Sequence, residues 1–179
     1  MIEFGDGLRL RPLTPGDGAA LGAAYDRNRT HLAYWDPVRA PSFFTASRQE
    51  ELVVQAVQDR EQGRAARFVL VNASGEVMGV ANLSNVVRGA FYSADLGYWI
   101  DASLVGRGLM SGIVAAVVER ARDELGLHRL QAATLLDNER SQAVLRRNGF
   151  DRIGMAPKYL QIAGQWQDHY LFQRILSED

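Results

Sequence analysis

Near residue 105 the chain changes from closely spaced strand patterns to a long helical pattern, and few folds accommodate that order. Residues 67–71, 77–87 and 91–100 are three runs with strand character, separated only by short turns. Consecutive strands joined by short turns predict an antiparallel meander. Apolar residues then recur at helical spacing, at Met110, Val114, Val117, Ala121 and Leu125. A sheet that runs into helix and strand units in this way indicates a mixed α/β fold.

The residues before this meander predict one strand and two helices. Residues 8–11 alternate apolar and basic side chains and predict a short first strand. A helix is expected from Pro15 to about Thr30, with Thr14 as its N-cap. A second helix is expected after the capping-box pattern at residues 47–50, where Ser is followed three positions later by Glu, and it should end near Gly63.

The residues after the long helix predict a further strand and helix, followed by a hairpin. Residues 129–136 have strand character, and residues 138–148 form a short helix that Gly149 stops. Residues 152–162 and 165–175 pair about a turn at Ala163 and Gly164. We therefore expect one mostly antiparallel sheet of about seven strands with flanking helices, in a single domain over residues 1–179.

Composition excludes several classes of site. The 179 residues include no cysteine, so disulfides, cysteine nucleophiles and thiolate metal sites are excluded. Three scattered histidines predict no metal centre. The net charge is −1 and the arginines are dispersed, which argues against direct nucleic-acid binding. No apolar run is long enough to span a membrane and no leader pattern opens the chain, so we expect a cytoplasmic protein without a membrane partner.

A glycine-rich segment precedes the long helix, at residues 105–112. Glycines at such a position let the backbone approach a ligand, and the free amides of a helix N-terminus favour an anion. The segment lacks the Lys-Ser/Thr ending of a Walker loop, and Ser111 occupies the place of the third glycine of a dinucleotide motif. The segment predicts a binding site for a phosphate or pyrophosphate. The structural alternative is a tight turn that requires small residues.

A second segment, residues 138–150, follows the next strand. Asn138 is suited to cap the helix, and Ser141 lies in the first turn, where its hydroxyl can face the end of the neighbouring strand. A plain cap and a hydroxyl bonded to its own helix backbone are the structural alternatives.

Together these segments resemble the GNAT acetyltransferases, and most closely their RimJ/RimL-type branch. The glycine loop of that branch corresponds to Gly106-x-Gly108-Leu109-Met110. A second motif corresponds to Asn138, Ser141, Val144, Leu145, Arg147, Gly149 and Phe150. Residues 8–13, 95–100 and 164–172 resemble its first strand, fourth strand and last hairpin. The five motifs occur in the family's order along nearly the whole chain.

The resemblance implies an N-acetyltransferase in which an amine attacks the thioester of acetyl-CoA directly, in a ternary complex. It assigns acetyl-CoA to Ile100, Val105, Gly106, Arg107, Gly108, Leu109, Met110, Asn138 and Arg147. A backbone amide of the fourth strand would donate to the developing oxyanion, and Ser141 to the leaving thiolate. At Val105 the family commonly has Gln or Arg, so one side-chain contact near the phosphates is missing here.

The general base predicted from the sequence is Asp95, where the family usually has Glu, with Glu76 as a weaker second choice. An exposed strand carboxylate is the structural alternative for Asp95. His169 follows Asp168, but neighbours on a strand face opposite ways, so we interpret this histidine as a structural or acceptor-pocket residue.

The acceptor is expected to contact Tyr34, Trp35, Asp36 and Trp166, although aromatic residues also suit a core or a homodimer contact. We expect a protein N-terminal α-amine, because its pKa near 8 leaves more neutral nucleophile at pH 7 than a lysine with a pKa of about 10.4. Two alternatives remain open. One is a small-molecule amine such as an antibiotic, polyamine or amino acid, and the other is an acyl-CoA-binding module without catalysis.

Overall fold

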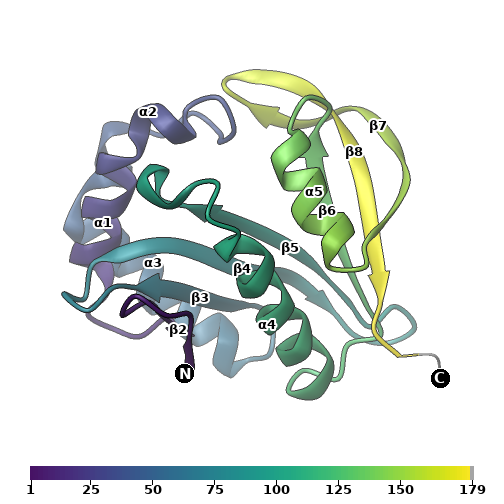
Figure 1. The fold of residues 1–179 in the computed structure, drawn as a ribbon, viewed down its shortest axis with the longest axis horizontal. Coiled ribbons are helices and arrows are strands. Elements are labelled where there is room, and N and C mark those ends of the chain that lie inside the picture. The colour runs from purple at the N-terminus through teal and green to yellow at the C-terminus, as the bar shows by residue number, and fades with distance from the viewer. Residues whose placement is uncertain (178–179) are drawn as a thin grey trace.

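The computed structural model describes residues 1–177 and contains one eight-stranded sheet, in the order β1-β2-β3-β4-β5-β6-β8-β7 (Figure 1). The strands are β1 Ile2–Glu3, β2 Arg9–Pro12, β3 Ala66–Val71, β4 Val77–Val87, β5 Ser93–Ile100, β6 Arg129–Leu135, β7 Asp151–Ile162 and β8 Gln165–Ile175. The helices are α1 Gly18–Arg27, α2 Arg29–Leu32, α3 Ala46–Glu61, α4 Leu109–Asp123 and α5 Glu139–Arg147, with 3₁₀ turns η1 Pro41–Phe44 and η2 Ala102–Leu104.

The sheet confirms the predicted mixed α/β class and the predicted meander. Strands β3, β4 and β5 pair antiparallel, and so do β7 and β8. Only β5 and β6 run parallel, because α4 carries the chain back between them. The structure has one strand more than the seven expected. This difference is β1, two residues in which Ile2 pairs with Leu10, too short to give an alternating pattern.

Two apolar layers enclose the sheet because side chains alternate along each strand. On one face, α4 packs over a large core that includes Leu83, Leu96 and Leu130. On the other face, α1 and α3 pack over β3 and the start of β4 through a smaller core that includes Leu21, Val53 and Val69. In Figure 1, α1 and α3 lie to the left, away from β6, β7 and β8 on the right.

The predicted N-cap of the first helix was wrong. The helix begins at Gly18 rather than Pro15, and Asp17 precedes it in place of Thr14. Gly16 has φ of +96°, which an α-helix does not accept, so no helix can start at Pro15.

The predicted capping box was also wrong, because the cap of α3 is Thr45, whose hydroxyl accepts from the Arg48 amide. Glu50, which would have completed the box, reaches α1 instead. Its two carboxylate oxygens accept from the Gly16 and Gly18 amides, each at 2.8 Å. A residue that the local pattern assigned to its own helix thus caps another one.

Candidate active site

Strands β5 and β6 diverge, and the opening between them organises the site. They pair only from Ser93 with Arg129 to Asp95 with Gln131. Beyond that point β5 continues to Ile100 against β4, while β6 continues to Leu135 against β8. The last five residues of β5 therefore have no partner strand on the β6 side.

The free edge of β5 carries backbone hydrogen-bonding groups. The amide of Asp101 donates to Met78 on the β4 side at 2.8 Å, whereas the carbonyl of Tyr92 accepts from His128 on the β6 side at 2.8 Å. Backbone groups alternate in direction along a strand. Leu96, Tyr98 and Ile100 consequently turn their N–H and C=O groups into the opening.

Ser141 lies at this opening, in the first turn of α5. Its amide donates to the Asn138 side chain at 3.1 Å, which confirms Asn138 as the helix cap. Its hydroxyl oxygen is 2.8 Å from the hydroxyl oxygen of Tyr98. Burial raises the pKa of Tyr98 to about 12, although its bond to Ser141 acts in the opposite direction. The Tyr98–Ser141 pair thus joins β5 to α5 across the opening.

The glycine loop leads from the end of β5 into α4. Gly106 and Gly108 have φ of +83° and +75°, in the left-handed region that favours glycine, and a Cβ on either would meet open space. Gly108 is the N-cap of the 15-residue helix α4, whose first amides have no acceptor within the helix. The loop is therefore open to an anion.

The side chains of the loop have different surroundings. Met110 is buried in the large core, so only its backbone is available to a ligand. Val105 and Leu109 are half-buried, and the Arg107 guanidinium pairs with Asp6 at 2.5 Å. Gly112 lies under the Phe4 ring, which a Cβ would approach to 3.0 Å. The N-terminal turn thus packs beside the start of α4.

Arg147 is exposed in the last turn of α5, at the other end of that helix from Asn138. The neighbouring Asn148 donates its side-chain amide to the Ser111 carbonyl, in the first turn of α4, at 3.1 Å. The end of α5 therefore lies beside the start of α4, so Arg147 is on the same side of the sheet as the loop.

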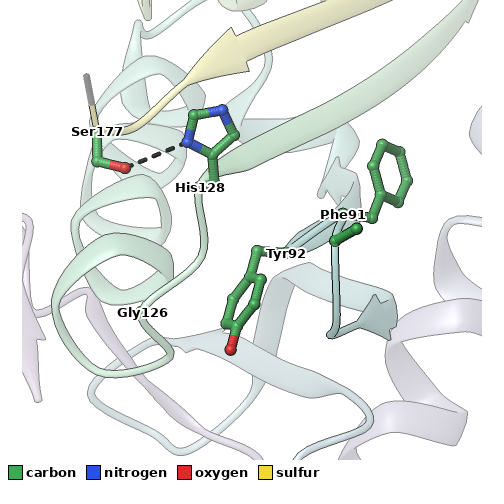
Figure 2. Close-up of a pocket in the computed structure, with 6 residues that line it drawn as sticks. Phe91, Tyr92, Gly126, His128 and Ser177 are labelled. Carbon is green, nitrogen blue, oxygen red and sulfur yellow. Dashed lines mark hydrogen bonds between the residues drawn. The ribbon is translucent and has the colours of Figure 1, made fainter. Parts of the chain in front are cut away.

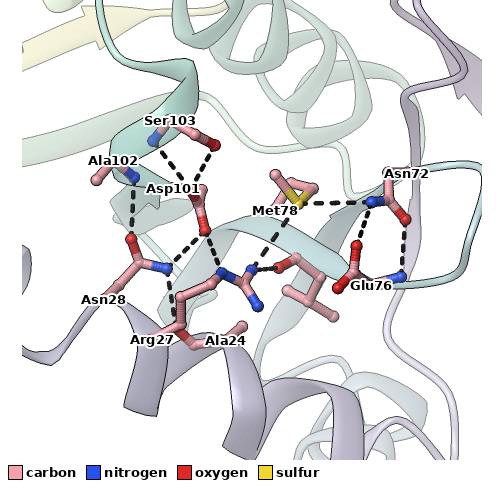
Figure 3. Close-up of polar contacts among 10 residues, drawn as sticks. Ala24, Arg27, Asn28, Asn72, Glu76, Met78, Asp101, Ala102 and Ser103 are labelled. Carbon is pink, nitrogen blue, oxygen red and sulfur yellow. Dashed lines mark hydrogen bonds and ion pairs between the residues drawn. The ribbon is translucent and has the colours of Figure 1, made fainter.

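A polar network that the sequence did not predict fixes the end of β5 to α1 (Figure 3). The Asp101 carboxylate accepts from Arg27 at 2.9 Å and from Asn28 at 2.8 Å, and Asn28 in turn accepts from the Ala102 amide. The other carboxylate oxygen of Asp101 accepts from the backbone amide of Ser103 at 2.9 Å and from its hydroxyl at 2.6 Å.

The centre of this network is buried, with Asp101 3% exposed and Asn28 1% exposed, whereas Arg27 and Ser103 at its edges are exposed. Burial alone would raise the pKa of Asp101, but the hydrogen bonds outweigh it and hold the pKa well below its ordinary value. Because Asp101 leads through η2 into the glycine loop, the network fixes where that loop begins.

Asp95 lies where β5 and β6 separate, on the opposite face from Tyr98. It is half-buried, and its carboxylate accepts from the side-chain amide of Asn85 at 2.8 Å. The side chains of Asn82 and Gln131 lie on the same face by register and stay partly exposed, and Gly97, opposite Asn82, adds no side chain to cover it. The sheet therefore presents an open polar surface opposite the α5 side of the gap.

The aromatic segment after α2 lies against two other elements. Tyr34 donates its hydroxyl to Asp137 in the β6–α5 turn at 2.6 Å, and its ring meets the Trp35 ring edge-on at 4.6 Å. The Asp36 carbonyl accepts from Ala163 at the tip of the β7–β8 hairpin, while its carboxylate pairs with Arg39.

Trp166 lies on that hairpin and is 62% exposed. Figure 1 shows α2 and the hairpin tip near one another, above the strands. The structure thus brings the segment with Tyr34, Trp35 and Asp36 to the hairpin that carries Trp166.

Comparison with known proteins identifies the family. Residues 7–151 match the acetyltransferase (GNAT) domain. The chain belongs to the GNAT acetyltransferase family. Over 167 residues it is 37% identical to the [ribosomal protein uS5]-alanine N-acetyltransferase of Escherichia coli K12, covering 93% of this chain and 86% of that protein.

Solved structures agree with this assignment. The ribosomal-protein-S5-alanine acetyltransferase of Vibrio fischeri superimposes with a TM-score of 0.95 at 32% identity, covering 99% of this chain and 97% of that one. RimJ of Mycobacterium smegmatis, in complex with CoA-disulfide, gives a TM-score of 0.87 at 29% identity, covering 94% and 81%. The GNAT fold and the N-acetyltransferase class predicted from the sequence are confirmed.

This acetyltransferase also has a separate concavity of about 400 Å³, and Figure 2 shows the residues that line it. Phe91 and Tyr92 line it, together with Gly126 and with His128, whose ring contacts Ser177 at 3.3 Å. It lies at the start of β5, whereas the glycine loop follows the end of that strand. None of the predicted site residues lines this concavity.

Two further residues that the sequence singled out make local contacts in the structure. His169 is 3% exposed, and its ring Nδ1 lies 2.9 Å from the Gln167 carbonyl oxygen. Glu76 accepts from Asn72 in the β3–β4 turn at 2.7 Å. Within residues 1–177, no three histidine, aspartate or glutamate side chains gather as metal ligands, and no helix could cross a membrane.

Proposed function

We propose that this GNAT acetyltransferase transfers the acetyl group of acetyl-CoA to the α-amine of a protein N-terminus, by direct attack in a ternary complex. One observation carries the proposal. The opening between β5 and β6 has Ser141 and the glycine loop on one side of the sheet, and Asp95 with an open polar surface on the other. Two substrates can therefore meet through the gap from opposite faces.

The residues present suit acetyl-CoA, which is a substrate and supplies a reactive thioester. Gly106, Gly108 and the first amides of α4 would bind its pyrophosphate, because they leave open space in front of the helix N-terminus. The backbone of Ile100 on the free edge of β5 would bind the arm that links the phosphates to the thioester. Arg147, beside the start of α4, would contribute positive charge.

Three groups would act on the reaction itself. Asp95 attracts the ammonium form of the acceptor and takes up its proton, directly or through water. A backbone N–H of Leu96 or Tyr98, turned into the opening, donates to the charge that develops on the carbonyl oxygen. Ser141 donates to the sulfur as the bond between carbon and sulfur breaks. No covalent enzyme intermediate is required.

Two arguments favour an N-terminal α-amine as the acceptor. The relative at 37% identity is a uS5-alanine N-acetyltransferase, and the match covers 93% of this chain. An α-amine also has a pKa near 8, against about 10.4 for a lysine, so more of it is neutral near pH 7 and it needs a weaker base. At the hairpin tip, Trp35 and Trp166 would hold the residues that follow the amine.

A peptide pair tests the proposal. One peptide begins with a free alanine and contains a lysine, and the other has the same sequence with a blocked N-terminus. We expect acetyl-CoA to modify the first at its α-amine, located by mass spectrometry, and to leave the second unmodified. Equal modification of the lysine in both peptides, or turnover only with small amines such as spermidine, would refute the protein N-terminus as acceptor.

A further inference from the structure

The hydroxyl of Tyr98 makes two contacts with one residue of α5. Its oxygen lies 2.8 Å from the Ser141 hydroxyl oxygen and 3.2 Å from the Ser141 carbonyl oxygen. Tyr98 belongs to β5 and is 43 residues from Ser141 in the sequence. Its side chain packs against the large core, on the same side of the sheet as α5.

These two contacts permit two arrangements of protons with the same heavy-atom positions. A carbonyl oxygen only accepts, whereas each hydroxyl both donates and accepts. When Tyr98 donates to the Ser141 carbonyl, its oxygen accepts from the Ser141 hydroxyl. When Tyr98 donates to the Ser141 hydroxyl oxygen instead, the serine proton is released for another acceptor.

We propose that Tyr98 is a positioning residue for departure of the coenzyme A thiolate, acting through Ser141. As the carbon–sulfur bond breaks, sulfur keeps the electron pair and Ser141 turns its hydroxyl proton toward it. Tyr98 then shifts its own hydrogen bond from the Ser141 carbonyl to the Ser141 hydroxyl oxygen. Both protons stay on their oxygens, so the pair supplies hydrogen bonds and transfers no proton.

The surroundings of Tyr98 suit this role. Because burial raises its pKa to about 12, the phenol keeps its proton over the working range of an enzyme. Successive hydrogen bonds polarise one another in a site shielded from water, so a bond from Tyr98 makes Ser141 a better donor. The Asn138 cap holds the Ser141 backbone, which leaves rotation of the two hydroxyl groups as the only movement required.

A binding experiment without any acceptor tests the inference. Coenzyme A is bound to the wild-type enzyme and to the Tyr98→Phe, Ser141→Ala and double variants, and its thiol is titrated by the ultraviolet absorbance of the thiolate. We expect each single variant to raise the pKa of the bound thiol above the wild-type value. We expect the double variant to match Ser141→Ala, because Tyr98 acts only through that hydroxyl.

Tyr92→Phe is the matched control, because the Tyr92 hydroxyl makes no hydrogen bond within residues 1–177. It should leave the thiol pKa unchanged. An unchanged thiol pKa in Tyr98→Phe would overturn the inference, and so would a further rise when Tyr98→Phe is added to Ser141→Ala. The inference rests on the proposed use of acetyl-CoA, but the titration is independent of which amine is the acceptor.

Turnover gives a second reading, with whichever amine the enzyme acetylates. Tyr98→Phe should lower kcat by about tenfold, which corresponds to roughly 1.4 kcal/mol, and change the KM for acetyl-CoA less than about twofold. In the Ser141→Ala background the same substitution should have no effect on kcat. Equal losses in both backgrounds would show that Tyr98 acts independently of Ser141.

Discussion

Replacing Asp101 by Asn is the sharpest test of how the glycine loop is held. One Asp101 oxygen accepts from Ser103, and the other accepts from Arg27 and Asn28. An asparagine oxygen can still accept from Arg27 and Asn28, but its nitrogen would then face the Ser103 amide, which only donates, and the Ser103 hydroxyl, which can turn to accept. One hydrogen bond to a charged group is then lost and the other three exchange a charged partner for a neutral one, where each bond to the charge is worth about 1.5–3 kcal/mol.

The expected loss in the free energy of unfolding is therefore about 3 kcal/mol or more, which lowers the Tm of a chain of this size by roughly 6–12 °C. Urea unfolding followed by circular dichroism measures it. We also expect weaker binding of coenzyme A at a temperature where the variant is folded, because Asp101 leads into residues 102–108. Calorimetric titration measures that affinity.

The matched control is Asp26→Asn, since Asp26 forms an exposed ion pair with Arg29 one residue before Arg27. It should cost about 0.5 kcal/mol or less. If Asp101→Asn lowered the free energy of unfolding by less than about 1 kcal/mol, or by no more than the control does, the network would not hold the end of β5 in place and the reasoning would be refuted.

Three further predictions concern the loop, the acceptor and acid stability. Gly108→Val should weaken coenzyme A binding at least about tenfold in a titration, whereas Gly63→Val, equally left-handed and open, should not. Trp166→Ala should raise the KM for the peptide and leave the KM for acetyl-CoA unchanged. A peptide KM equal to that of the wild-type enzyme would contradict a role of Trp166 in binding the acceptor. Folding lowers the pKa of Asp101, so the free energy of unfolding of the wild-type protein should decrease as the pH is lowered from about 4. Asp101→Asn should make this decrease smaller, as measured by urea unfolding at a series of pH values.

Local patterns were enough to predict most of the secondary structure. The β4 range, residues 77–87, was predicted without error, and the β7–β8 turn at Ala163 and Gly164 was also correct. The α5 helix begins after Asn138, which bonds the Ser141 amide only three residues away. Elements of this kind depend on neighbours in sequence, so their residues suffice to define them.

Contacts between distant residues were decided by the tertiary structure. The carboxylate of Glu50 was assigned to its own helix and caps α1 instead. Tyr98 meets Ser141 across 43 residues, and Asp101 meets Arg27 across 74. No local pattern marks these pairs, because each depends on the register of β5 in the sheet and on the packing of a helix against it. The sequence alone thus specified the family, the strands and the glycine loop, whereas the separation of β5 from β6 arises only when β6 pairs with β8 and leaves the end of β5 open.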